Sequence, residues 1–119
     1  MNASDEFDPE AVIRLRRLGN AAFVREMIDL ARQLAVEKVA AARIALDAGD
    51  LLALGDAVHA LKSSSSGIGA RHMFELASRI ELLSRRGERE LLPQLLAELE
   101  AAHKRVQPRL AAARENVAP

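Results

Sequence analysis

The chain has 119 residues without an evident internal repeat, 50% of them hydrophobic but only 3% aromatic, so one small domain with an aliphatic core is expected. Its 17 basic and 17 acidic residues cancel, which argues against binding driven by nucleic-acid phosphates or acidic membranes, and without cysteine it has no disulfide or zinc–thiolate site. No segment approaches the ~20 apolar residues that cross a bilayer, and the N-terminus does not resemble a secretion signal, so a soluble, cytoplasmic protein is expected.

Capping residues and glycines divide the sequence into five expected helices. Asp8-Pro9-Glu10 is typical of a helix start, Asn20 and Asp50 are N-cap residues, and glycines follow most of the predicted helix ends. The predicted helices cover residues 9–18, 20–48, 50–66, 70–86 and 88–114. Pro108 is expected to kink the last helix or fray its end. Residues 1–7 are expected to be flexible, residues 8–114 to form the domain, and residues 115–119 to be a disordered tail.

Apolar residues recur at helical spacing in each long segment. In the second helix, the residues assigned to the core are Phe23, Met27, Leu30, Leu34, Val39, Ile44 and Leu46. In the last helix, they are Leu92, Leu95, Leu96, Leu99, Val106 and Leu110. No alternating strand pattern is evident. The pattern predicts an all-α fold, an antiparallel up-down four-helix bundle with a short additional N-terminal helix across one end.

The third helix carries a histidine on its outer face. Because a helix turns by about 100° per residue, His59 lies roughly 140° from the centre of the apolar stripe. That stripe consists of Leu51, Leu54, Val58, Leu61 and Ser65. Gly55 and Ser63, one turn before and after, leave little bulk over the imidazole, and Lys62 brings a cation within reach. An open, nucleophilic imidazole beside a cation suits a phosphoryl acceptor.

Other residues on this face are candidates for partner contact. Leu52 is an apolar residue on a face that is expected to be exposed to solvent, which indicates a docking surface. Gly55, Asp56 and Ser66 share that face. Asp56, three residues before His59, is either an orienting group for the ring or an ordinary solvated acid.

Residues 59–70, His-Ala-Leu-Lys-Ser-Ser-Ser-Ser-Gly-Ile-Gly-Ala, resemble the signature of histidine-containing phosphotransfer (Hpt) domains. The similarity extends over about residues 7–105 and includes Ile80-Glu81 and Arg86-Gly87 in the next helix. The sequence departs from the family at Ser63, where glycine is most common. A hydroxyl there could bond a phosphoryl oxygen or crowd its approach, and the sequence does not decide between the two.

The resemblance implies a function. In this family, a histidine at the position of His59 accepts a phosphoryl group from a receiver-domain aspartate and passes it to another receiver. Lys62 would offset phosphoryl charge, and the third and fourth helices would form the docking face. The resemblance implies no cofactor, since Mg²⁺ belongs to the receiver, and no kinase activity. Such domains occur alone or in bacterial hybrid sensor kinases. The isolated domain is expected to be a monomer without nucleic-acid or membrane contacts.

Two other classes of function remain as alternatives. Glu100-Ala-Ala-His103 and Asp56-Ala-Val-His59 mimic the Glu-x-x-His pairs of metal-binding bundles, although the two further inward glutamates are not evident. A bundle that only binds a signalling partner is the second alternative, but the presence of both His59 and Lys62 argues against it. Nucleic-acid binding is disfavoured because the basic residues are scattered and aromatic residues are almost absent.

Overall fold

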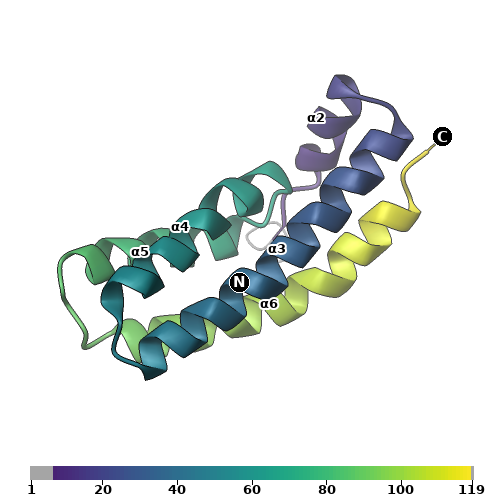
Figure 1. Ribbon diagram of the computed structural model, residues 1–119. Helices are drawn as coiled ribbons and strands as arrows, with labels where there is room; N and C mark the ends of the chain where they lie inside the picture. Colours follow the sequence, from purple (N-terminus) through teal and green to yellow (C-terminus); the bar gives the residue numbers. More distant parts are fainter. Residues whose placement is uncertain (1–6, 119) are drawn as a thin grey trace.

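The computed structural model describes residues 7–118, and these residues form helices without strands (Figure 1). The helices are α2 (Glu10–Leu18), α3 (Ala21–Asp47), α4 (Leu51–Gly67), α5 (Arg71–Arg85) and α6 (Leu92–Glu115). The all-α prediction is therefore confirmed for the described residues. None of the described helices combines the length and the apolar character needed to cross a membrane.

Two side-chain caps determine where the central helices begin. The Asn20 side chain accepts a hydrogen bond from the Phe23 amide at 2.9 Å, and Asp50 accepts one from the Ala53 amide at 3.0 Å. Each bond satisfies an amide that has no partner within its own helix. Between the two helices, Gly49 has a φ of 71°, a conformation that favours glycine and reverses the chain.

The last helix begins later than the sequence pattern indicated. It starts at Leu92 rather than Glu88, because Pro93 is suited only to the first turn of a helix and therefore sets the start close to itself. Residues 86–91 form the preceding turn. The helix continues through Pro108 to Glu115, so Pro108 does not end it.

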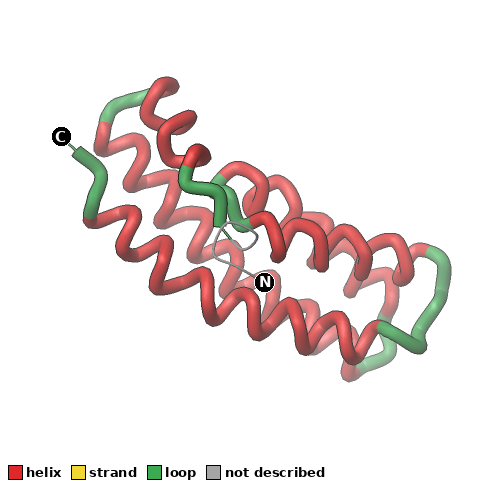
Figure 2. The backbone as a smooth tube through the Cα atoms, turned by 180° about the vertical axis from the view of Figure 1, so that it is seen from behind, coloured by secondary structure: helices red, strands yellow, loops and turns green. Residues whose placement is uncertain are grey.

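Four of the helices pack around a shared core. α3 lies against α4 and α6, and α5 likewise lies against α4 and α6. Figures 1 and 2 show that the α4–α5 pair covers one half of the longer α3–α6 pair, while α2 packs beside the other half of α3. Figure 2 also shows the connecting loops at the ends of the helices, so none of the loops within residues 7–118 runs along the outward faces of α4 and α5.

The core confirms the predicted stripe of α6 but only part of that of α3, where Val39 is buried and Phe23 and Leu46 pack against the core. All six leucine and valine positions assigned to α6 are buried. In α3, by contrast, Leu30 is 56% and Ile44 is 70% exposed. The buried residues are Ala21, Val24, Ile28, Ala31, Ala35, Val39, Ala42 and Ala45. The prediction followed the largest apolar side chains, whereas α3 turns five of its alanines inward, where they let neighbouring helices approach closely.

Both ends of the described chain pack onto the helices. Phe7, assigned to the flexible segment, and Val117, assigned to the tail, are each 8% exposed. The Asp8 amide donates a hydrogen bond to the carbonyl of Gly69 at 2.7 Å, which ties the segment before α2 to the turn between α4 and α5. Phe7 and Val117 therefore both contact the helices, while the domain limits at residues 8 and 114 remain a prediction. Residues 1–6 and 119 of the predicted flexible ends lie outside the described residues.

The alanine face of α3 predicts a stability effect. Ala42 is fully buried, so Ala42→Leu inserts three carbons where no space exists and should lower the free energy of unfolding by about 1–3 kcal/mol. Ala41→Leu, one position along on the exposed side, makes the same change without steric conflict. Urea denaturation of both variants measures the difference. Equal stability of the two variants would show that the assigned face of α3 is wrong.

Candidate functional site

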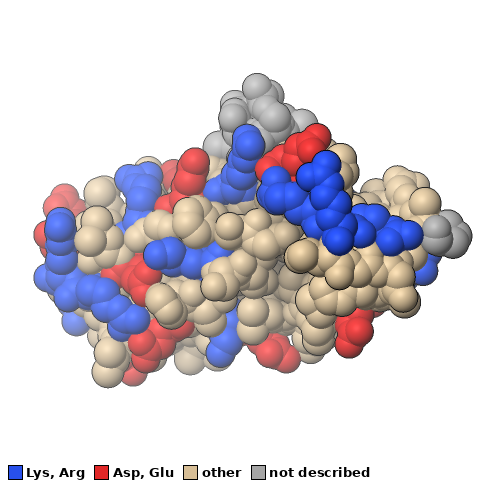
Figure 3. Space-filling view, turned by 90° about the horizontal axis from the view of Figure 1, so that it is seen from above, with Lys and Arg blue, Asp and Glu red and all other residues tan. Residues whose placement is uncertain are grey.

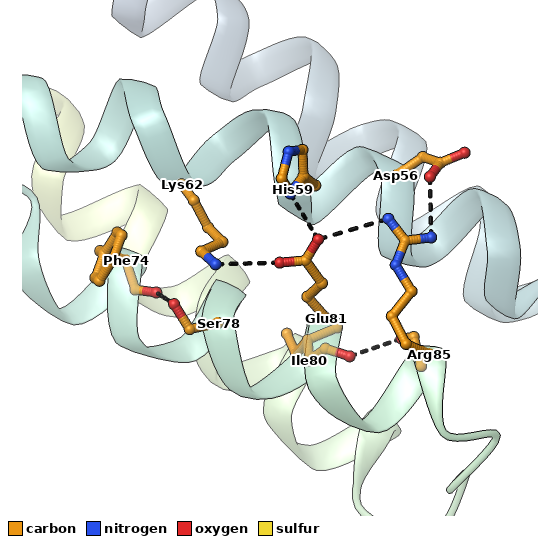
Figure 4. Close-up of polar contacts among 9 residues, drawn as sticks. Asp56, His59, Lys62, Phe74, Ser78, Ile80, Glu81 and Arg85 are labelled. Atoms are coloured by element: carbon orange, nitrogen blue, oxygen red, sulfur yellow. Dashed lines mark hydrogen bonds and ion pairs between the residues drawn. The ribbon is translucent and has the colours of Figure 1, made fainter.

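His59 lies on the outward face of α4, as its helical phase predicted. Its side chain is 68% exposed, and its Nδ1 lies 2.6 Å from Oε2 of Glu81 on α5 (Figure 4). The imidazole is thus held on one edge by a neighbouring helix and open to solvent elsewhere.

Glu81 is the centre of the polar network. Its Oε1 accepts a hydrogen bond from Lys62 Nζ at 3.1 Å, and its Oε2 receives both His59 and, at 3.5 Å, the Nη2 of Arg85. The Glu81 side chain is only 16% exposed. Burial opposes its ionisation, but the hydrogen bonds from Lys62 and His59 outweigh burial and hold the pKa of Glu81 below its usual range. Glu81 is therefore an ionised acceptor at neutral pH.

This acceptor determines which ring nitrogen of His59 is reactive. A carboxylate has no hydrogen to donate, so the Nδ1 of His59 carries the hydrogen and donates it to Glu81. In the neutral ring, Nε2 then holds an unshared electron pair. The contact with Glu81 thus leaves Nε2 as the nucleophilic atom of an exposed side chain.

Lys62 lies between Glu81 and an aromatic ring. Its Nζ is 5.8 Å from the centre of the Phe74 ring on α5, and its side chain is 30% exposed. The predicted cation is therefore present beside the imidazole, and its contacts hold it on the α5 side of the site (Figure 4).

Gly55 and Asp56 differ from their predicted surroundings. Gly55 is buried rather than open, because the guanidinium of Arg85 covers it. Asp56 is 65% exposed, and its Oδ1 pairs with Arg85 Nη1 at 3.0 Å. The ring of His59 is thus oriented by Glu81, whereas Asp56 holds Arg85 (Figure 4).

The remaining predicted residues lie along the same face of α4. Leu52 is 70% exposed, and Ser63 and Ser66 are exposed as well. Ser66 also lines a surface pocket together with Phe74 and Arg71 of α5. The structure therefore brings His59, Lys62 and Ser63 onto one surface, with Leu52 and Ser66 at either end.

Two residues of the network were not predicted to act here. Glu81 belongs to the segment that resembles Hpt domains, but it stands 22 residues after His59, and no local spacing connects the two. Arg85 follows Glu81 by one helical turn. Only the packing of α5 against α4 brings both side chains to the histidine.

The residues of the alternative metal site have other partners. Glu100 receives a hydrogen bond from Arg43 Nε at 3.1 Å, and the Nε2 of His103 lies 2.8 Å from the amide nitrogen of Gln107. Partial burial lowers the pKa of His103. Within residues 7–118, no group of three or more metal-ligating side chains is placed to hold an ion.

Charges are mixed on the surface. On the face seen in Figure 3, Lys and Arg side chains lie among Asp and Glu side chains and uncharged residues, and the largest basic group covers the end that carries α2. Many basic residues have acidic partners, such as Arg114 with Asp29 at 2.7 Å. No continuous basic track runs along this face.

Comparisons with known proteins agree with this geometry. Residues 24–109 match the family model described as the Hpt domain. The crystal structure of histidine-containing phosphotransfer protein B (HptB) from Pseudomonas aeruginosa PAO1 has the same fold, with a TM-score of 0.87 and 24% sequence identity. That match covers 95% of this chain and 97% of the other. No curated protein sequence matches significantly.

The lowered pKa of Glu81 predicts a pH-dependent contribution to stability. A carboxyl with a depressed folded-state pKa stabilises the fold above its unfolded pKa of about 4.3, and this contribution is lost as the pH falls through the folded-state pKa. Glu81→Gln should therefore be less stable than the parent at pH 7, and the difference should shrink as the pH falls below about 4.3.

Chemical denaturation across this range checks the prediction. Glu75→Gln, the same replacement at an exposed position of the same helix, is the matched control for the loss of one carboxylate. A Glu81→Gln difference that is constant with pH would contradict the assigned ion pairing.

Proposed function

The chain belongs to the Hpt domain family, whose members relay phosphoryl groups in two-component signalling, and we propose that its carrier atom is Nε2 of His59. The single observation behind this proposal is the contact between Nδ1 of His59 and Glu81, which leaves Nε2 unprotonated on an exposed side chain. Of the other histidines, His103 is held by Gln107 in a half-buried position.

The transfer step follows from this geometry. Nε2 attacks the phosphorus of an aspartyl phosphate on a receiver domain, the bond between phosphorus and the aspartate oxygen breaks, and the aspartate leaves as a carboxylate. The imidazole ring then carries positive charge, which is stabilised by the ionised Glu81 at Nδ1. The same steps in reverse deliver the phosphoryl group to the aspartate of a second receiver.

Lys62 and Ser63 assist the phosphoryl group in this proposal. The ammonium of Lys62 turns from Glu81 towards the incoming phosphoryl oxygens and offsets their charge. Ser63, one turn after His59, stands where its hydroxyl adjusts the approach of the group. Leu52, Asp56 and Ser66 belong to the surface that the receiver contacts. Gly55 takes part only through the Arg85 side chain that covers it.

The proposal extends to the location, cofactor need, oligomeric state and helix arrangement of the protein. The protein acts as a cytoplasmic phosphohistidine carrier without kinase activity, either alone or within a hybrid sensor kinase. It needs no cofactor of its own, because Mg²⁺ is bound by the receiver. The domain acts as a monomer and contacts neither nucleic acid nor membranes. Its helices form an antiparallel up-down four-helix bundle with α2 as an additional N-terminal helix, supported by the pairwise packing of α3 to α6.

Replacement of the proposed carrier should abolish phosphorylation. Incubation with a phosphorylated receiver should label the parent protein with an acid-labile, base-stable phosphate, and His59→Gln should remove the label because glutamine has no imidazole nitrogen. His72→Gln, on α5, is the control and should be labelled like the parent. Labelling of His59→Gln would contradict the proposed carrier.

Loss of the nearby cation should slow transfer without unfolding the protein. Lys62→Ala removes the positive charge that offsets the negative charge of the phosphoryl oxygens, so we expect transfer to slow by about tenfold. The Lys62 ion pair is partly exposed, so the melting temperature should change little. Stopped-flow transfer and thermal melting measure both effects, with Lys38→Ala on α3 as control. An unchanged transfer rate would exclude the proposed role of Lys62.

A further inference from the structure

The guanidinium of Arg85 lies flat against the backbone of α4 at Gly55. A Cβ atom built on Gly55 would be 2.9 Å from Nη1, 3.0 Å from Cζ and 3.2 Å from Nε of Arg85. All three atoms belong to the planar guanidinium, so the plane faces the helix. Contacts this short require a shift, so a Cβ atom at position 55 would displace the guanidinium at the end of the flexible Arg85 side chain from its place against α4.

The two terminal nitrogens of this guanidinium each contact a carboxylate. Nη1 contacts Asp56 at 3.0 Å, and Nη2 lies 3.5 Å from Oε2 of Glu81. That oxygen is the one that accepts the hydrogen from His59 Nδ1. Arg85 therefore stands between the carboxylate that orients the imidazole and a carboxylate on α4, one helical turn before the histidine (Figure 4).

We propose that Gly55 is a positioning residue for phosphoryl transfer, because its missing side chain leaves the space in which Arg85 braces Glu81 against His59. The inference rests on the proposed function of His59. Lys62 holds the other oxygen of Glu81 and leaves it when a phosphoryl group arrives. Arg85 is then the cation that remains beside Glu81, and Asp56 keeps it in place.

The test compares two glycine-to-alanine substitutions in α4. Gly55→Ala places a methyl group against Arg85, whereas Gly67→Ala, also in α4, places one in open space. Alanine favours helix at both positions, so neither variant should be less stable than the parent for reasons of propensity. Phosphoramidate serves as the donor: its P–N bond breaks as the bond to Nε2 forms, ammonia leaves, and no docking partner is required.

We expect phosphoramidate labelling of Gly55→Ala to be about tenfold slower than that of the parent, and labelling of Gly67→Ala to be unchanged. Arg85→Ala should show a similar loss. The double variant should be no slower than Arg85→Ala alone, because both changes remove the same brace. Additive losses, or equal rates for Gly55→Ala and Gly67→Ala, would overturn the proposal.

Ring-nitrogen NMR separates this proposal from the carrier assignment. In the parent, the ¹⁵N shifts of His59 should report the tautomer with hydrogen on Nδ1, and Gly55→Ala should raise the fraction with hydrogen on Nε2. A merely structural role for Gly55 would leave this fraction unchanged and would overturn the proposal. An unlabelled parent would instead overturn the carrier assignment, and the ring spectra would still decide the role of Gly55.

Discussion

The polar contacts around His59 depend on a carboxylate that joins two helices. Glu81 stands on α5, whereas His59 and Lys62 stand on α4, and the two oxygens of Glu81 divide these donors between them. Because a carboxylate only accepts hydrogen bonds, it selects the ring nitrogen that keeps the hydrogen. The nucleophilic atom of an exposed side chain is thus selected by a residue that is itself mostly buried.

This dependence places a requirement on the packing of α4 against α5. The two helices have the most extensive contact of any pair, and small residues are buried on both, including Ala57 and Ser65 on α4 and Ala77 and Ser84 on α5. Small side chains allow a short distance between helix axes. The alanine face of α3 allows the same on the other side of the core. A site made of short polar contacts therefore rests on helices whose contact faces place alanines and serines among the larger aliphatic residues of the core.

The features that could be predicted from the sequence are those that depend on the geometry of a single helix. The outward direction of His59 followed from helical phase alone, and the structure confirms it. The predicted core face of α3 was partly wrong, because the prediction assigned large residues such as Leu30 and Ile44 to the core in preference to alanines. Glu81 could not be placed, since its distance from the histidine depends on how two helices cross. Phase put Gly55 on the outer face, but it could not show that a guanidinium from α5 covers it.

The exposure of His59 also bears on how long a phosphoryl group would persist there. With 68% of the side chain in solvent, a group on Nε2 is reached by a receiver and by water alike. If His59 carries the group, its exposure would make the phosphorus–nitrogen bond accessible from the solvent side of α4. Receivers and water would then compete for the same phosphoryl group.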